Sequence, residues 1–124
     1  MLKKHFEVIE LVRKTIEETQ CQSLLWCGDI NTDFRRYTGQ VELVKDVMEQ
    51  LQLQKAWDMF NVDFTRMCSE NENVTTSIID HFFYSNNFSQ SVLDAGAIHS
   101  PDNSSDHCPV YIVFRSLKVD NAVF

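Results

Sequence analysis

The feature that most constrains this chain is a short apolar run, residues 24–27, followed at once by Gly28-Asp29-Ile30-Asn31. The run is too short for a typical helix and fits a buried strand. Gly28 allows the backbone to turn, so Asp29 and Asn31 emerge beyond the strand end, where ligands bind in open α/β folds. The alternative is a simple polar turn, in which Asp29 or Asn31 bonds its own backbone.

Length and charge narrow the functional classes. The 124 residues are enough for one domain, 1–124, with a modest core. The net charge of −7 argues against a protein that coats nucleic acid, but an enzyme can hold a phosphodiester through a cation bound to carboxylates. No apolar run approaches a membrane span, and the N-terminus does not resemble a signal peptide. We therefore predict an intracellular protein, nuclear or cytoplasmic, with no membrane partner.

Cysteine spacing indicates structural thiols. The chain has four cysteines, and no pair has the short Cys-x-x-Cys spacing of a zinc site. Disulfides are rare in proteins without secretory signals, so reduced thiols are expected. Cys27 and Cys108 lie in apolar runs and are predicted to be small buried hydrophobes.

The order of the expected elements is that of an α/β domain. Apolar residues recurring every three or four positions predict helices over 3–20 and 40–52. A polar turn over residues 69–73 predicts a hairpin with a five-residue loop, which joins the strands expected over 62–68 and 75–84. The remaining expectations are strands over 23–28, 62–68, 75–84, 90–99 and 108–115, a loop over 32–39, and a core-filling connector over 53–60, with no element assigned to 116–124.

Three polar clusters stand beside predicted strand ends. Metal-assisted attack on a phosphodiester needs oxygen ligands for a cation, a group that handles water, and a carboxylate that orients an imidazole. Each cluster combines an aspartate with an asparagine or a histidine, which supplies these groups. The clusters are Asp29 with Asn31, Asp80 with His81, and Asp106 with His107. His81 follows Asp80 on a strand and must point to the opposite face, so a structural role is predicted for it.

Residues 28–31, 77–85 and 105–110 resemble, in order, the three C-terminal signature motifs of the endonuclease/exonuclease/phosphatase superfamily. The resemblance covers about residues 3–115. It is strongest to the endonuclease domain of non-LTR retrotransposons, then to apurinic/apyrimidinic endonucleases. It implies the C-terminal half, one sheet with flanking helices, of a DNase I-like four-layered α/β sandwich.

The resemblance also implies roles for five residues. His107 would contact the scissile phosphate, and Asp80 would orient it. Asp29 would align the attacking water, and Asn31 would hold a phosphate oxygen. Asp106 and Asp29 would lie at the metal, Mg²⁺ or Mn²⁺. The substrate would be DNA, with RNA as the alternative.

The main departure from the superfamily concerns its N-terminal half. That half normally carries an Asn and the Glu that is the principal metal ligand, and neither has a counterpart in this sequence. We therefore expect weak Mg²⁺ affinity and little or no nuclease activity from this chain alone. Packing in the full fold also predicts an exposed apolar face, which would favour an N-terminal half or a second copy as partner. The residues expected there are Phe82, Tyr84, Val110, Ile112 and Phe114.

Other functions stay open at this stage. A catalytically silent binding domain could keep the scaffold and its motifs. A phosphatase acting on a small or lipid phosphoester is favoured slightly by the acidic charge, since counterion release gives nothing to an acidic surface. Arg35 and Arg36 could reach a phosphate or could simply be solvated. Coding sequence for a reverse transcriptase downstream would settle the retroelement origin.

Overall fold

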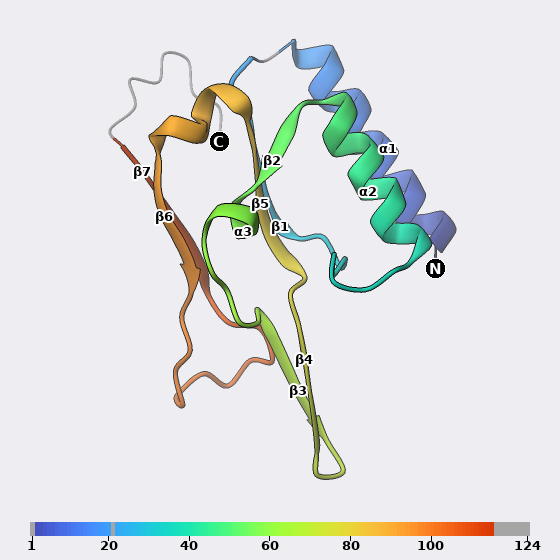
Figure 1. The fold of residues 1–124 in the computed structure, drawn as a ribbon. Coiled ribbons are helices and arrows are strands. Elements are labelled where there is room, and N and C mark those ends of the chain that lie inside the picture. Colours follow the sequence, from blue (N-terminus) through green and yellow to red (C-terminus); the bar gives the residue numbers. More distant parts are fainter. Residues whose placement is uncertain (1, 21, 116–124) are drawn as a thin grey trace.

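The computed structural model describes residues 2–20 and 22–115 and is a mixed α/β structure (Figure 1). Helices α1 and α2 and strand β1 lie where the sequence predicts them. The elements are α1 (Leu2–Thr19), β1 (Leu25–Asp29), α2 (Gly39–Gln50), β2 (Leu53–Lys55), α3 (Ala56–Met59), β3 (Arg66–Glu70), β4 (Asn73–Ser77), β5 (Asp80–Ser85), the 3₁₀ helix η1 (Asn86–Ser91), β6 (Val92–Ala97) and β7 (Val110–Phe114).

Strand β5 is the centre of a three-stranded antiparallel sheet with the order β1-β5-β2. Trp26 lies opposite Phe83, and Cys27 lies opposite Phe82. Because residues paired across an antiparallel ladder share a face, the first pair points to one side of the sheet and the second pair to the other. The sheet therefore has two faces, and each contributes to a separate core.

The first face packs against α1 and α2, which lie side by side on it (Figure 1). Phe83 is completely buried there, in one core with apolar residues of both helices. Helix α2 begins at a Thr38 cap, whose side chain accepts a hydrogen bond from the N–H of Val41. Such caps satisfy the otherwise unpaired N–H groups of a helix start. The buried members of this core are Ile9, Ile30, Val44, Val47, Met48 and Phe83.

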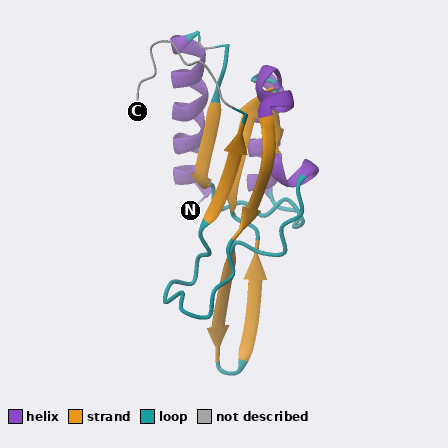
Figure 2. Cartoon of the chain, turned by 90° about the vertical axis from the view of Figure 1, so that its left-hand side faces the viewer, coloured by secondary structure: helices purple, strands orange, loops and turns teal. Residues whose placement is uncertain are grey.

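The second face is covered by α3 and by the antiparallel pair β6–β7 (Figure 2). Phe82 is 7% exposed and Tyr84 only 1%, so the expectation that these two would lie exposed is wrong. The cover comes from the chain itself, because Val110, Ile112 and Phe114 of β7 pack partly buried against the same cluster. The buried members are Ala56, Phe82, Tyr84, Val92 and Ala95.

Three further expectations about local structure are wrong. Residues 53–60 form β2 and α3 instead of a connector. The single strand expected over 75–84 is two strands, β4 and β5. The β3–β4 hairpin turns in two residues, Asn71 and Glu72, instead of the five expected. Both have a positive φ (48° and 70°), because a tight hairpin turn requires that backbone conformation. The hairpin extends away from both cores (Figure 1).

The break between β4 and β5 has a definite cause. The N–H of Ile78 donates to the Asp33 carboxylate (3.0 Å), and the N–H of Ile79 donates to the Thr65 hydroxyl (3.0 Å). Both donors are thus taken by side chains distant in sequence. The apolar composition of residues 78–79 gives no sign of this.

The cysteine expectation is corrected in part. Cys27 is exposed and Cys108 is half-buried, although both are free thiols as expected, like Cys68. Cys27 lies on β1, an edge strand among the described residues, which explains its exposure. Cys21 and residues 116–124 lie outside the described residues. No helix within residues 2–20 and 22–115 is long and apolar enough to cross a membrane.

Candidate active site

The first cluster forms where β1 ends. Asp29 lies opposite Asp80, the first residue of β5, so the two side chains share a face of the sheet. Asp29 Oδ1 accepts the N–H of Asn31 at 2.8 Å, and Asn31 has a positive φ of 53°. The local turn considered from the sequence therefore exists. It fixes one oxygen of Asp29 and leaves the other for contacts outside the turn.

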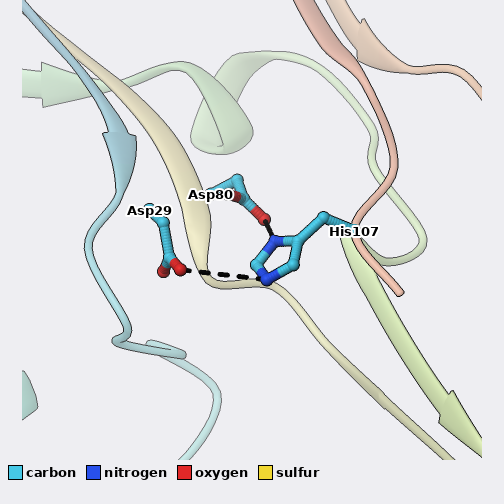
Figure 3. Close-up of side chains that lie close together, drawn as sticks. All are labelled: Asp29, Asp80 and His107. Atoms are coloured by element: carbon cyan, nitrogen blue, oxygen red, sulfur yellow. Dashed lines mark hydrogen bonds and ion pairs between the residues drawn. The ribbon is translucent and has the colours of Figure 1, made fainter. Parts of the chain in front are cut away.

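His107 lies between Asp80 and Asp29 (Figure 3). Its Nδ1 is 2.9 Å from Asp80 Oδ2, and its Nε2 is 3.8 Å from Asp29 Oδ2. A carboxylate can only accept, so Nδ1 carries a proton and Nε2 faces Asp29. The side chain of Asp80 is 13% exposed, that of His107 34% and that of Asp29 47%. The three groups thus form a chain from a buried anchor to an accessible carboxylate.

Thr65 connects β5, which carries Asp80, to the segment before β7 that carries His107. It is completely buried, and its hydroxyl accepts the N–H groups of Ile79 (3.0 Å) and Asp80 (3.1 Å). Its carbonyl accepts the N–H of Cys108 at 2.7 Å. One residue therefore fixes the backbone on both sides of the Asp80–His107 contact. The sequence gives no signal for this role, because a threonine in a segment expected to be a strand is ordinary, and the structure places Thr65 just before β3.

Asp106 lies outside the Asp29–Asp80–His107 cluster. Its Oδ2 accepts a hydrogen bond from Arg66 Nε at 3.0 Å. That hydrogen bond lowers the pKa of Asp106. Arg66 is thereby a polar neighbour of the site that sequence reasoning missed. The metal-binding role expected for Asp106 stays a prediction.

Arg35 is occupied by an ion pair. Both Nε (3.0 Å) and Nη2 (2.7 Å) donate to the Asp33 carboxylate, which also accepts the N–H of Ile78. Burial raises the pKa of Asp33, but these hydrogen bonds and the positive charge of Arg35 outweigh burial and lower it to about 2. Asp33 is thus a charged structural anchor next to the site, and a phosphate contact by Arg35 would compete with this pair.

His81 points away from Asp80, as the alternation of a strand requires. It is 2% exposed, and its Nε2 lies 2.6 Å from the carbonyl of Thr32, so Nε2 carries the proton. Its ring stacks on Phe83 and meets Phe34 edge-on. Burial lowers the pKa of His81. These contacts agree with a structural role.

The cluster offers donors to a divalent cation. One ligand atom from each of Asp29, Asp80 and His107 lies within 4.8 Å of the others. Mg²⁺ prefers oxygen ligands and keeps several waters. Asp80 Oδ2 already accepts from His107, so the accessible carboxylate of Asp29 is the most available ligand. The donor set fits a cation that retains much of its hydration.

Comparison with solved structures identifies the fold. The chain superposes on an AP endonuclease from Archaeoglobus fulgidus with a TM-score of 0.70, 15% identity, and coverage of 88% of this chain and 52% of that one. The TM-score is 0.67 for a 3′ phosphatase from Neisseria bound to product DNA hairpin, with 17% identity and coverage of 88% and 51%. It is 0.64 for an endonuclease/exonuclease/phosphatase family protein from Bacteroides thetaiotaomicron, with 21% identity and coverage of 93% and 46%.

These matches show that the chain has about half of the DNase I-like fold of endonuclease/exonuclease/phosphatase proteins. At 15–21% identity they establish the fold and leave specificity open. The chain spans about half the length of these three structures. No protein-family model and no curated protein sequence matches the chain.

Proposed function

We propose that this chain is the C-terminal half, over residues 1–124, of a Mg²⁺- or Mn²⁺-dependent phosphodiesterase that acts on DNA. The observation that carries the proposal is the Asp80–His107–Asp29 arrangement. It supplies an oriented imidazole and an accessible carboxylate beside each other, on a fold shared with DNA-acting enzymes. The motif resemblance in the sequence points to the same chemistry.

Each residue has a defined part in the proposed hydrolysis. Asp80 fixes the imidazole, so that Nε2 of His107 can contact a phosphoryl oxygen. Asp29 aligns a water and accepts its proton as the water oxygen attacks phosphorus. The P–O bond to the leaving oxygen breaks as the new bond forms, and the leaving oxygen takes up a proton from solvent water. Asn31 holds a non-bridging phosphate oxygen. Asp29 and Asp106 would hold the cation, which supplies charge neutralisation at the phosphoryl oxygens.

The chain alone should bind the cation weakly and hydrolyse slowly or not at all. The cluster places two carboxylates and one imidazole together, and one carboxylate oxygen is already committed to His107. The remaining ligands would come from the other half of the fold. This half could be supplied by a partner chain or by further sequence.

Mn²⁺ broadening of NMR signals tests the site without requiring turnover. The signals of residues near Asp29 and His107 should broaden at millimolar-range Mn²⁺ and recover with EDTA. Asp29→Asn should abolish the broadening, whereas Asp102→Asn, an exposed loop carboxylate, should not alter it. Broadening confined to other carboxylates would refute the metal site.

Plasmid nicking tests the chemistry. Any Mg²⁺-dependent nicking should disappear in His107→Ala and persist in Asp102→Asn. Robust, EDTA-sensitive nicking by the chain that is lost in His107→Ala would support the chemistry and overturn the expected weakness. Nicking that survives His107→Ala would contradict the assigned role of His107.

A retroelement origin is the finer part of the proposal, and it rests on the motif resemblance alone. Reverse-transcriptase coding sequence in the flanking DNA would support it.

The second candidate function is a phosphatase for a small or lipid phosphoester, which the net charge of −7 favours. Hydrolysis of small phosphomonoesters without DNA binding would select it. Absence of both activities together with absence of site-specific Mn²⁺ broadening would leave a silent binding domain.

A further inference from the structure

A small cleft opens beside Asn31. Its volume is about 190 Å³, and it lies between the loop after β1, the start of α2, and the strands β3 and β4. The neighbouring Asn31 belongs to the proposed catalytic cluster, but most of the lining does not. Besides Thr32 and Asp33, the polar side chains around the cleft are those of Asn31, Arg36, Thr38, Gln40, Arg66 and Ser77.

The cleft carries positive charge in an acidic chain. The Arg36 guanidinium has no ion pair within the described residues, and its one hydrogen bond there is a long contact of 3.4 Å to the carbonyl of Thr76. Arg66 shares its charge with Asp106, which lies outside the cleft lining. Two guanidinium groups therefore border one concavity, and one of them is uncompensated.

The single carboxylate at the cleft does not cancel this charge. Asp33 is 3% exposed at its side chain and is ionised at neutral pH, since its pKa is about 2. Both of its oxygens are occupied, Oδ1 by the N–H and Nε of Arg35, and Oδ2 by Arg35 Nη2 and the N–H of Ile78. Its charge is balanced by Arg35, which does not line the cleft.

The chemistry of this lining is that of a phosphate site. Guanidinium groups present several N–H donors in a planar fork that matches phosphate oxygens. Thr38, Gln40 and Ser77 add neutral donors, which suit an oxyanion. A phosphate bound here would lie next to Asn31, and so next to the Asp29–His107 pair.

We propose that this cleft binds the phosphodiester adjacent to the one that is hydrolysed, so that the substrate is a polynucleotide strand and not a small phosphoester. The proposal rests on the proposed function, because it takes the Asp29–His107 region as the place of hydrolysis. A small phosphomonoester has no second phosphate and would leave the cleft unused. Arg36 and Arg66 would therefore favour binding of a polynucleotide strand over binding of a small phosphomonoester.

Salt dependence of DNA binding tests the cleft without hydrolysis. The probe is a fluorescein-labelled duplex of about 20 base pairs, and binding is followed by anisotropy in EDTA over a KCl series. Each phosphate contact adds about 0.9 to the slope of log affinity against log salt. Arg36→Gln should therefore reduce the slope by about 0.9, whereas Arg36→Lys should retain it. Lys45→Gln, an exposed cation on α2 away from the cleft, is the matched control and should leave the slope unchanged.

The outcomes separate this proposal from the proposed function. A slope that falls in Arg36→Gln supports the cleft even when no nicking is detected. An unchanged slope in Arg36→Gln, or a wild-type chain that does not bind the duplex, overturns the cleft even when nicking is detected. Displacement of the duplex by millimolar inorganic phosphate, lost in Arg36→Gln, would assign the cleft to a small phosphate ligand and would also overturn the proposal.

Discussion

Replacing Asp33 with asparagine should weaken the attachment of the loop between β1 and α2 to the start of β5. Asp33 is almost completely buried, and its carboxylate joins Arg35 to the N–H of Ile78, in the break between β4 and β5. The amide introduced by Asp33→Asn could still accept at one oxygen, but the side chain would lose its charge and present an N–H₂ group to a donor. The loop would then be held less firmly against the start of β5, where Asp80 lies.

The magnitude follows from the pKa of Asp33. Its ordinary value is 3.8, and the folded value is about 2. At about 1.4 kcal/mol per pKa unit, the ionised carboxylate contributes roughly 2 kcal/mol to the free energy of unfolding at neutral pH. Because the folded pKa is the lower one, this contribution is complete above the unfolded pKa and is lost as pH falls through the folded pKa. About half should be gone by about pH 3.

Urea unfolding followed by the fluorescence of Trp26 and Trp57 measures this effect. At pH 7, Asp33→Asn should lower the free energy of unfolding by about 2 kcal/mol, and the difference from wild type should shrink to about 1 kcal/mol at about pH 3. Asp46→Asn, an exposed carboxylate on α2, is the control and should change stability by less than about 0.5 kcal/mol. A destabilisation of the same size at both pH values would refute the assignment to the ionised carboxylate.

Three further substitutions probe the site and its support. Thr65→Val removes the acceptor for two buried N–H groups and should lower the free energy of unfolding in urea by about 1–3 kcal/mol. Thr65→Ser keeps the hydroxyl and should retain most of this stability, and equal losses in the two variants would argue against the hydroxyl as the stabilising group. Gly28→Ala should cost about 1–3 kcal/mol through backbone strain alone, because φ is 135° and no atom lies within 4 Å of the added Cβ; unchanged stability would contradict the strain. Asp80→Asn should decrease the Nδ1–H tautomer of His107 in ¹⁵N NMR spectra, and an unchanged tautomer ratio would count against Asp80 as its anchor.

Local patterns predicted the elements whose sequence signal lies within one short segment. Apolar residues at spacings of three and four indicated α1 and α2, and the apolar run before Gly28 indicated β1. The end of β1 is also local, since Asp29 bonds the N–H of Asn31 two residues later. Each of these signals lies within neighbouring residues, so the sequence shows it directly even though the elements also pack against distant partners.

The features that the sequence did not predict depend on distant partners. The break at residues 78–79 arises because Asp33 and Thr65 take two N–H groups that a continuous strand would use. The burial of Phe82 and Tyr84 depends on where β6–β7 packs, and no periodicity encodes that. The pairing of Arg66 with Asp106 likewise joins two segments 40 residues apart.

The packing of β6–β7 on the three-stranded sheet changes where a partner is expected to bind. Since β6–β7 buries Phe82 and Tyr84, the expected partner half or second copy has to contact other apolar residues. Strands β1 and β7 each pair on only one side within the described residues, and each exposes apolar side chains, Leu25 on β1 and Tyr111 and Val113 on β7. Unpaired strand edges with exposed apolar residues favour association with another chain. The proposed partner is therefore expected at these two strand edges, and because β1 ends at Asp29, a partner along β1 could also add ligands to the proposed metal site.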